Sequence, residues 1–143
     1  MSPVIKVMID TNVLFSAMYK THGTPFEAFA KASRTPYRLV ICDQIIQELC
    51  DNFKRKFPKK YPAIEKFLEI AQYDVVSLTD EDEIAHDEIS ISHANDRPII
   101  RAARKANVDI FITGDERVCV SGITNPKIMK ARQFVDMGEF NNL

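Results

Sequence analysis

The chain has few of the side chains that bind zinc or form disulfides. Its 143 residues include three cysteines and three histidines, namely Cys42, Cys50, Cys119, His22, His86 and His93. The cysteines show no CxxC or CxxH spacing, and the histidines form no HxH or HxxxH pair. An odd number of scattered thiols favours reduced cysteines in a cytosol over a disulfide framework or a zinc site.

Long apolar runs are also absent. Nowhere do about 18 apolar residues follow one another, and the first apolar run is interrupted by Lys6 and closed by Asp10. We therefore expect a soluble, cytoplasmic protein without a signal peptide. The formal net charge of −1 neither supports nor excludes binding to nucleic acid.

Short apolar runs alternate with longer amphipathic stretches along the whole chain. This alternation is typical of βαβ units with a parallel sheet. We expect one domain over residues 1–143, with a three-layer α/β/α fold and a central parallel sheet of about five strands. The expected strands are 4–9, 38–41, 74–78, 109–113 and 128–129. The expected helices are 12–19, 24–32, 43–57, 61–72, 81–91, 96–106 and a last one through 134.

Two of the apolar runs end on a carboxylate, Asp10 near the start of the chain and Asp115 near its end. In an open parallel sheet, ligands bind outside the carboxyl ends of the strands. If the two runs are neighbouring strands, both acids face one cleft, and paired carboxylates suit a hard divalent cation. Each acid also has a local interpretation, Asp10 as a helix N-cap and Asp115 as a turn residue.

Two further acids lie on expected helices. Asp96 shares a face with Ile99, Ile100 and Ala103, the stripe that should pack on the sheet. A buried charge is costly unless it is paired, so an acid there indicates a metal or a polar cluster, although Asp96 can also cap its own helix. Glu48 lies off the centre of the apolar stripe of its expected helix, so its position alone indicates an ordinary exposed acid. That stripe consists of Ile45, Ile46, Leu49 and Phe53.

Four segments, taken in order, resemble the PIN domain family, in particular its VapC-like branch of toxins from toxin–antitoxin pairs. They are Ile9–Ala17, Ile45–Leu49, Asp96–Ala103 and Val108–Asp115. The resemblance spans nearly the whole chain. It implies a ribonuclease that depends on Mg²⁺ or Mn²⁺, with RNA as its substrate and a cognate antitoxin as its partner.

The resemblance also implies which residues form the site. The catalytic and metal-binding residues are Asp10, Glu48, Asp96 and Asp115. The supporting polar neighbours are Thr11, Asn12 and Thr113. The segment after Asp115 departs from the commoner pattern of the family, which leaves open whether Glu116 joins the metal site. Whether the chain forms a homodimer is also left open.

These residue types also suit the metal-assisted hydrolysis of a phosphodiester when the resemblance is set aside. A phosphodiester repels hydroxide, whereas a metal ion lowers the pKa of bound water and neutralises the leaving oxygen. Mg²⁺ prefers oxygen ligands, so clustered carboxylates without histidine or cysteine are the expected donors.

Two basic segments are candidates for RNA contact. Residues 54–61 mix cations with aromatic rings, as single-strand binders do, and a second stripe of arginines follows one helix face. The RNA-binding candidates are Lys54, Arg55, Lys56, Arg97, Arg101 and Arg104. Either segment can also be an ordinary solvated surface, because basic side chains favour helix C-termini.

Other functional classes compete with a nuclease. A phosphoacceptor signalling domain also places an acid at a strand end, but it requires two acids after the first strand, where Thr11 and Asn12 stand here. A phosphatase of the haloacid-dehalogenase type requires Asp-x-Asp, and Asn12 replaces the second acid. A catalytically silent PIN fold that serves as a binding module is the third alternative, although all four candidate acids are present.

Overall fold

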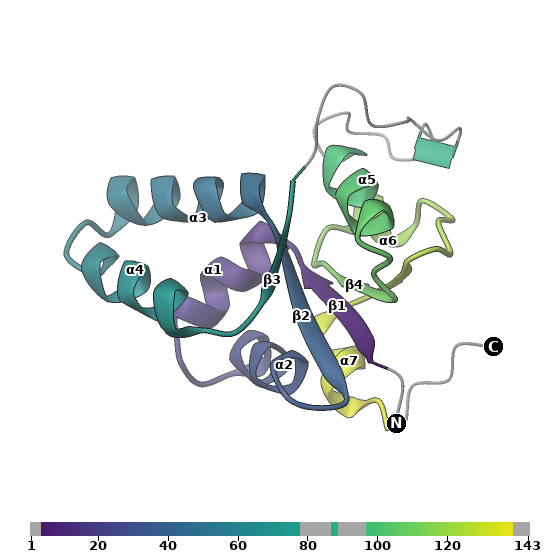
Figure 1. Ribbon diagram of the computed structural model, residues 1–143, viewed down its shortest axis with the longest axis horizontal. Helices are drawn as coiled ribbons and strands as arrows, with labels where there is room; N and C mark the ends of the chain where they lie inside the picture. Colours follow the sequence, from purple (N-terminus) through teal and green to yellow (C-terminus); the bar gives the residue numbers. More distant parts are fainter. Residues whose placement is uncertain (1–3, 78–86, 89–96, 139–143) are drawn as a thin grey trace.

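A computed structural model describes residues 4–77, 87–88 and 97–138 of the chain. Within these residues, five parallel strands form one sheet in the order β3-β2-β1-β4-β5 (Figure 1). The strands are β1 (Ile5–Ile9), β2 (Tyr37–Cys42), β3 (Asp74–Val76), β4 (Ile110–Ile112) and β5 (Lys127–Met129). The expected α/β/α fold with a parallel sheet is therefore confirmed.

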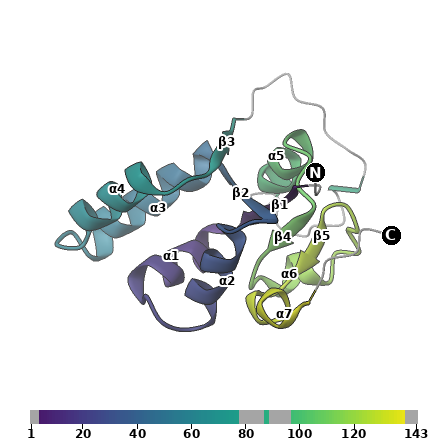
Figure 2. The ribbon, with the colours of Figure 1, turned by 60° about the horizontal axis from the view of Figure 1, so that its bottom comes forward.

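The central strands β1, β2 and β4 are rich in β-branched and other apolar residues because helices cover both faces of the sheet. Val7, Met8 and Ile9 of β1 are fully buried. The helices are α1 (Thr11–Tyr19), α2 (Thr24–Ala32), α3 (Asp43–Lys56), α4 (Tyr61–Ile70), α5 (Arg97–Lys105), α6 (Glu116–Cys119) and α7 (Ala131–Asp136). Helix α5 lies on one side of the sheet, and α1 and α2 lie on the other (Figures 1 and 2). Helix α7 packs on α2, and α3 packs on α1 and α4.

Helices α1 and α3 both begin where a strand ends. Residue Asp10 links β1 to α1, and Asp43, which directly follows β2, is the first residue of α3. Helix α3 buries Ile45, Leu49 and Phe53 of the expected stripe and leaves Ile46 partly buried. Because α1 and α3 follow the carboxyl ends of β1 and β2, the first turn of each helix lies at that end of the sheet.

The differences from the expected elements are local. Helix α4 ends at Ile70 and β3 ends at Val76, each two residues earlier than expected. Helix α4 ends because the backbone of Ala71 adopts an extended conformation. Most of the helix expected over 81–91 lies outside the described residues, and residues 87–88 form a short 3₁₀ turn. The four-residue helix α6 was not expected, because one turn is too short to show an apolar period.

The three cysteines are unpaired. Burial raises the pKa of each thiol, so all three are protonated at neutral pH. Among the described residues, no helix combines the length and the apolar character that a bilayer crossing requires.

Candidate active site

The carboxyl ends of β1 and β4 meet at the point where the strand order reverses. Ile9 of β1 is paired with Ile112 of β4, and the backbone N–H of Asp10 donates to the Ile112 carbonyl at 2.9 Å. The strands are therefore neighbours, as expected, and the residues that follow them face one another. In open α/β sheets this switch point is where ligands bind.

Asp10 has two hydrogen-bonded carboxylate oxygens. Its Oδ1 accepts from the backbone N–H of Thr11 at 2.8 Å, which caps α1. Its Oδ2 accepts from the Thr113 hydroxyl at 2.9 Å. The capping interpretation of Asp10 is thus correct, and the cap uses one carboxylate oxygen while Thr113 orients the other.

Thr11 connects Asp10 with Glu48. The Thr11 hydroxyl is buried and donates to Oε2 of Glu48 at 3.0 Å. Gln44, one turn earlier on α3, lies with its side-chain amide 3.3 Å from Oε1 of the same carboxylate. Glu48 is therefore turned toward α1 and held by two partners, although its position relative to the apolar stripe suggested an ordinary exposed acid.

Asp115 joins the same network through the backbone. Its N–H donates to the hydroxyl of Thr113 at 3.1 Å, and Thr113 is fully buried. The Asp115 side chain caps α6 by accepting from the backbone N–H of Arg117, and the Arg117 guanidinium binds both carboxylate oxygens at 3.0 and 3.1 Å. Two threonines thus link three of the four candidate acids.

The sequence did not single out Gln44 or Arg117. The spacing of four residues between Gln44 and Glu48 is a helical contact that could have indicated Gln44. No pattern indicated Arg117. A third unexpected contact lies beside the site: the Ser77 hydroxyl binds Asp43 and holds the pKa of that carboxyl below its usual range.

The donor set consists of carboxylate and hydroxyl oxygens, which are the ligands that Mg²⁺ and Mn²⁺ prefer. Asp96, the fourth candidate acid, lies outside the described residues. In the part of the chain that the structure describes, no three acidic, histidine or cysteine side chains form a group able to hold a metal ion. Metal binding by these residues is therefore a prediction in which Asp96 completes the group.

Two other polar residues stand at the edge of the site. Asn12 is exposed in the first turn of α1. Glu116 forms an ion pair with Lys130, the residue that follows β5. The Glu116 carboxylate thus has a cation partner, as Asp115 has in Arg117, so this contact does not separate the two acids as metal ligands.

The two basic segments differ in how their charges are compensated. Arg101 binds the buried carboxylate of Glu88 at 2.9 Å, and both terminal nitrogens of Arg104 bind Asp87. The side chain of Arg97 lies outside the described residues. Arginines 101 and 104 therefore fasten α5 to the 3₁₀ turn at residues 87–88.

The lysines of the other segment lie against aromatic rings. The Nζ of Lys54 lies 4.8 Å from the ring centroid of Tyr61, and the Nζ of Lys56 lies 5.6 Å from that of Phe15. Arg55 donates to the side chain of Asn52 at 3.0 Å. These cations extend from the C-terminal end of α3, which also suits the helix dipole.

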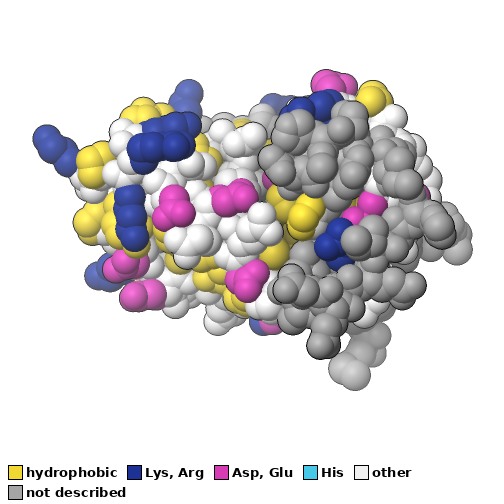
Figure 3. Space-filling view, turned by 90° about the horizontal axis from the view of Figure 1, so that it is seen from above, with side chains coloured by type: hydrophobic (Ala, Val, Ile, Leu, Met, Phe, Trp, Pro, Cys, Tyr) yellow, Lys and Arg dark blue, Asp and Glu magenta, His cyan; other side chains and the backbone are white. Residues whose placement is uncertain are grey.

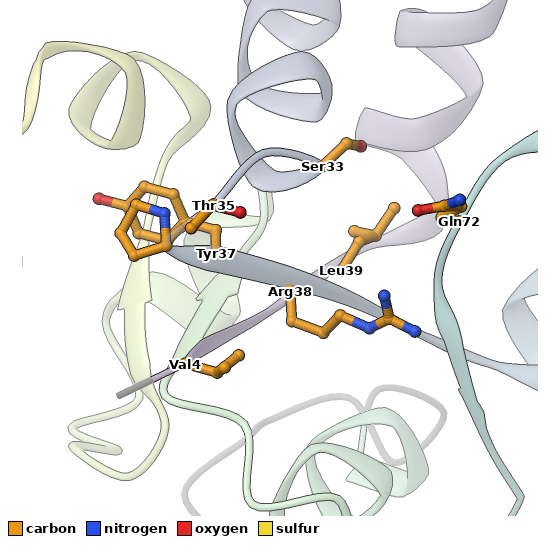
Figure 4. A pocket seen from close by; sticks show the side chains of 8 residues that line it. Val4, Ser33, Thr35, Tyr37, Arg38, Leu39 and Gln72 are labelled. Carbon is orange, nitrogen blue, oxygen red and sulfur yellow. The ribbon is translucent and has the colours of Figure 1, made fainter. Parts of the chain in front are cut away.

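A separate hollow of about 290 Å³ lies at the amino end of β2 (Figure 4). Figure 4 shows Arg38 extending along it toward the segment that carries Gln72. Arg38 is paired with Asp74 at 2.7 Å, so its charge is compensated within the chain. Because this hollow lies at the opposite end of the strands from Asp10, it is not part of the candidate site.

Comparison with protein families assigns the fold. The family described as PIN domain matches residues 6–117, which include Asp10, Glu48, Asp96 and Asp115. The chain belongs to the PIN domain family. No curated protein matches this PIN domain in sequence.

One similar solved structure is the crystal structure of VapBC2 from Rickettsia felis, bound to a DNA fragment from its promoter. The matched chain is 13% identical in sequence, with a TM-score of 0.62. The match covers 88% of this PIN domain and 98% of the other chain. At this identity the likeness concerns the fold.

Proposed function

We propose that this PIN domain is a metal-dependent endoribonuclease. The observation that carries the proposal is the hydrogen-bonded chain from Glu48 through Thr11, Asp10 and Thr113 to Asp115 at the carboxyl ends of β1 and β4. Acids held in fixed orientations at a switch point are arranged to bind a cation and a charged substrate. Membership of the PIN domain family supports a nuclease over a phosphoacceptor domain.

Asp10, Glu48, Asp96 and Asp115 would hold Mg²⁺ or Mn²⁺. The bound cation would neutralise a phosphodiester, lower the pKa of water and stabilise the leaving oxygen. The contribution of the protein is to orient the carboxylates. Thr113 holds Asp10, and Thr11 holds Glu48, so both carboxylates have defined orientations before any substrate arrives.

The test is incubation of the purified protein with a labelled RNA pool in Mg²⁺, Mn²⁺ or EDTA. We expect cleavage that requires metal, and nearly complete loss of it in Asp10→Asn, Asp96→Asn, Asp115→Asn and Glu48→Gln. Asp51→Asn is a matched control, because Asp51 is exposed on the same helix as Glu48. Absence of cleavage by the wild type with either metal would support the binding-module alternative. Wild-type activity of Asp96→Asn would remove that residue from the site.

We also propose that the protein is the toxin of a toxin–antitoxin pair and binds a cognate antitoxin. The structural neighbour belongs to a complex named VapBC2, which supports this proposal. An apolar hollow of about 200 Å³ between α1, α2 and α4 is lined in part by Met18, Phe29 and Phe67, which suits a protein partner. We expect induced wild-type protein to arrest bacterial growth, Asp10→Asn to be harmless, and coexpression of the antitoxin to restore growth.

A further inference from the structure

Helices α1 and α3 run side by side away from the candidate site, and their facing side chains form successive contacts. Next to the site, Thr11 binds Glu48. One turn further, the rings of Phe15 and Phe53 stack with centroids 4.4 Å apart. Residues 11, 15 and 19 share one face of α1 because they are spaced four apart. Contacts near the acids are thus polar, and those further along are aromatic.

The last contact lies between Tyr19 and Phe57, whose ring centroids are 4.6 Å apart. The distance along α1 from Thr11 to Tyr19 is about 12 Å, at 1.5 Å per residue. Tyr19 is 42% exposed, so part of its ring is accessible from solvent. A hollow of about 270 Å³ beside Phe15 and Tyr19 is also lined by Lys20 and His22.

Lysines accompany these rings. The Nζ of Lys60 lies 4.1 Å from the ring centroid of Tyr19, and the Nζ of Lys56 lies over Phe15. Among the residues that the structure describes, no carboxylate forms an ion pair with Lys56 or Lys60. Figure 3 shows Lys and Arg side chains at one end of the molecule, over the end of α3 and the turn to α4, with side chains of the hydrophobic class among them.

We propose that this aromatic–lysine surface, formed by Phe15, Tyr19, Lys56 and Lys60, binds the single-stranded RNA on one side of the cleaved phosphodiester. The proposal rests on the proposed ribonuclease function. Lysines would contact backbone phosphates, and the exposed ring of Tyr19 would stack on a base, as in other single-strand binders.

Charge compensation favours this surface over α5. Arg101 and Arg104 are already paired with Glu88 and Asp87, so an RNA phosphate would have to displace an acid from each. A phosphate that approaches Lys56 or Lys60 displaces only a cation–π contact, which is a weak interaction at an exposed position. The surface also begins one helical turn from Thr11, which joins it to the candidate site without a gap.

The test measures binding of a labelled single-stranded RNA by fluorescence anisotropy in the inactive Asp10→Asn background, over a range of salt concentrations. The variants are Lys56→Gln/Lys60→Gln and Tyr19→Ala. The matched control for charge is Arg34→Gln/Lys66→Gln, which removes two exposed cations outside this surface. Tyr19→Phe is the control for the ring, because it keeps the stacking face.

We expect the double lysine variant to weaken binding about tenfold and to reduce the slope of log K against log salt by about 1.4, or about 0.7 per lost phosphate contact. Tyr19→Ala should also weaken binding about tenfold, whereas Tyr19→Phe and the charge control should bind within twofold of the parent. In the active background, the charge control should cleave RNA at the single-turnover rate of the wild type.

Unchanged affinity and salt slope in the lysine variant would overturn the inference while leaving the ribonuclease proposal intact, provided that the wild type cleaves RNA. Absence of cleavage by the wild type would instead refute the proposed function. If the lysine variant binds RNA normally but loses the antitoxin, the surface is a protein interface, and the inference is wrong.

Discussion

The hydroxyl of Thr113, at the end of β4, donates to Oδ2 of Asp10, at the end of β1, although 103 positions separate the two residues. The same oxygen of Thr113 accepts the backbone N–H of Asp115. A single buried side chain therefore orients two candidate metal ligands. Neighbouring carboxylates repel one another. A side chain that fixes their orientation therefore affects the stability of the fold as well as the activity of the site.

Thr113→Val should lower both stability and activity. Valine has the same shape but leaves the part-buried N–H of Asp115 without its hydroxyl partner, which costs about 1 kcal/mol. Thr113→Ser keeps the hydroxyl and should lose less stability. Urea unfolding and RNA cleavage of the three proteins test this. Equal stability of the valine variant and the wild type would contradict the orienting role.

Asp10→Asn should raise the melting temperature of the metal-free protein. Asparagine keeps the cap of α1, because it is as good an N-cap as aspartate, while it removes one of the clustered negative charges. Added Mn²⁺ should stabilise only the wild type, by mass action. Calorimetry with and without Mn²⁺ measures both effects, and an equal response of the two proteins to the metal would oppose the assignment of Asp10.

Arg117→Gln should tighten Mn²⁺ binding by up to about fivefold, the equivalent of an exposed ion pair of at most about 1 kcal/mol. The reason is that the Arg117 guanidinium occupies both carboxylate oxygens of Asp115, which a metal ion would need. The control is Arg132→Gln, which breaks the exposed pair with Asp136. Titration calorimetry provides the affinities, and weaker binding by Arg117→Gln would show that the arginine does not compete.

Arg101→Gln should destabilise the fold more than Arg104→Gln, because it removes a cation from the buried carboxylate of Glu88. Arg104→Gln should cost at most about 1 kcal/mol, since its partner Asp87 is half exposed. Chemical denaturation measures the free energy of unfolding of the two variants and of the wild type. Similar losses would mean that the burial of Glu88 does not matter to the fold.

The ion pair between Arg38 and Asp74 should make a small, pH-dependent contribution to stability. The hydrogen bond from Arg38 lowers the pKa of Asp74 in the folded protein. A lowered folded pKa stabilises the protein above the unfolded pKa of about 3.9, and the contribution disappears as the pH falls through the folded pKa. The melting temperatures of wild type and Asp74→Asn should therefore converge as the pH falls below about 5 and through the lowered pKa of Asp74. A constant difference would contradict this origin.

Local patterns in the sequence were sufficient to locate most of the elements. The apolar runs that end at Asp10 and Asp115 and the stripe of Ile45, Leu49 and Phe53 correspond to observed strands and a helix. Periodicity reports such elements because it reflects which face each residue must bury. Glu48 was identified only through the resemblance to PIN domains, since its helical position alone did not distinguish it.

The hydrogen bonds and ion pairs were decided by the tertiary structure. Thr113 reaches Asp10 because the register between β1 and β4 aligns Ile9 with Ile112, and no local pattern encodes a register between strands so far apart in sequence. Arg101 and Arg104 formed a basic stripe in the sequence, yet the chain path brings Glu88 and Asp87 against them. Whether a basic side chain is paired depends on which acids the fold places beside it. Whether an apolar side chain is buried depends mainly on the period of its own helix or strand.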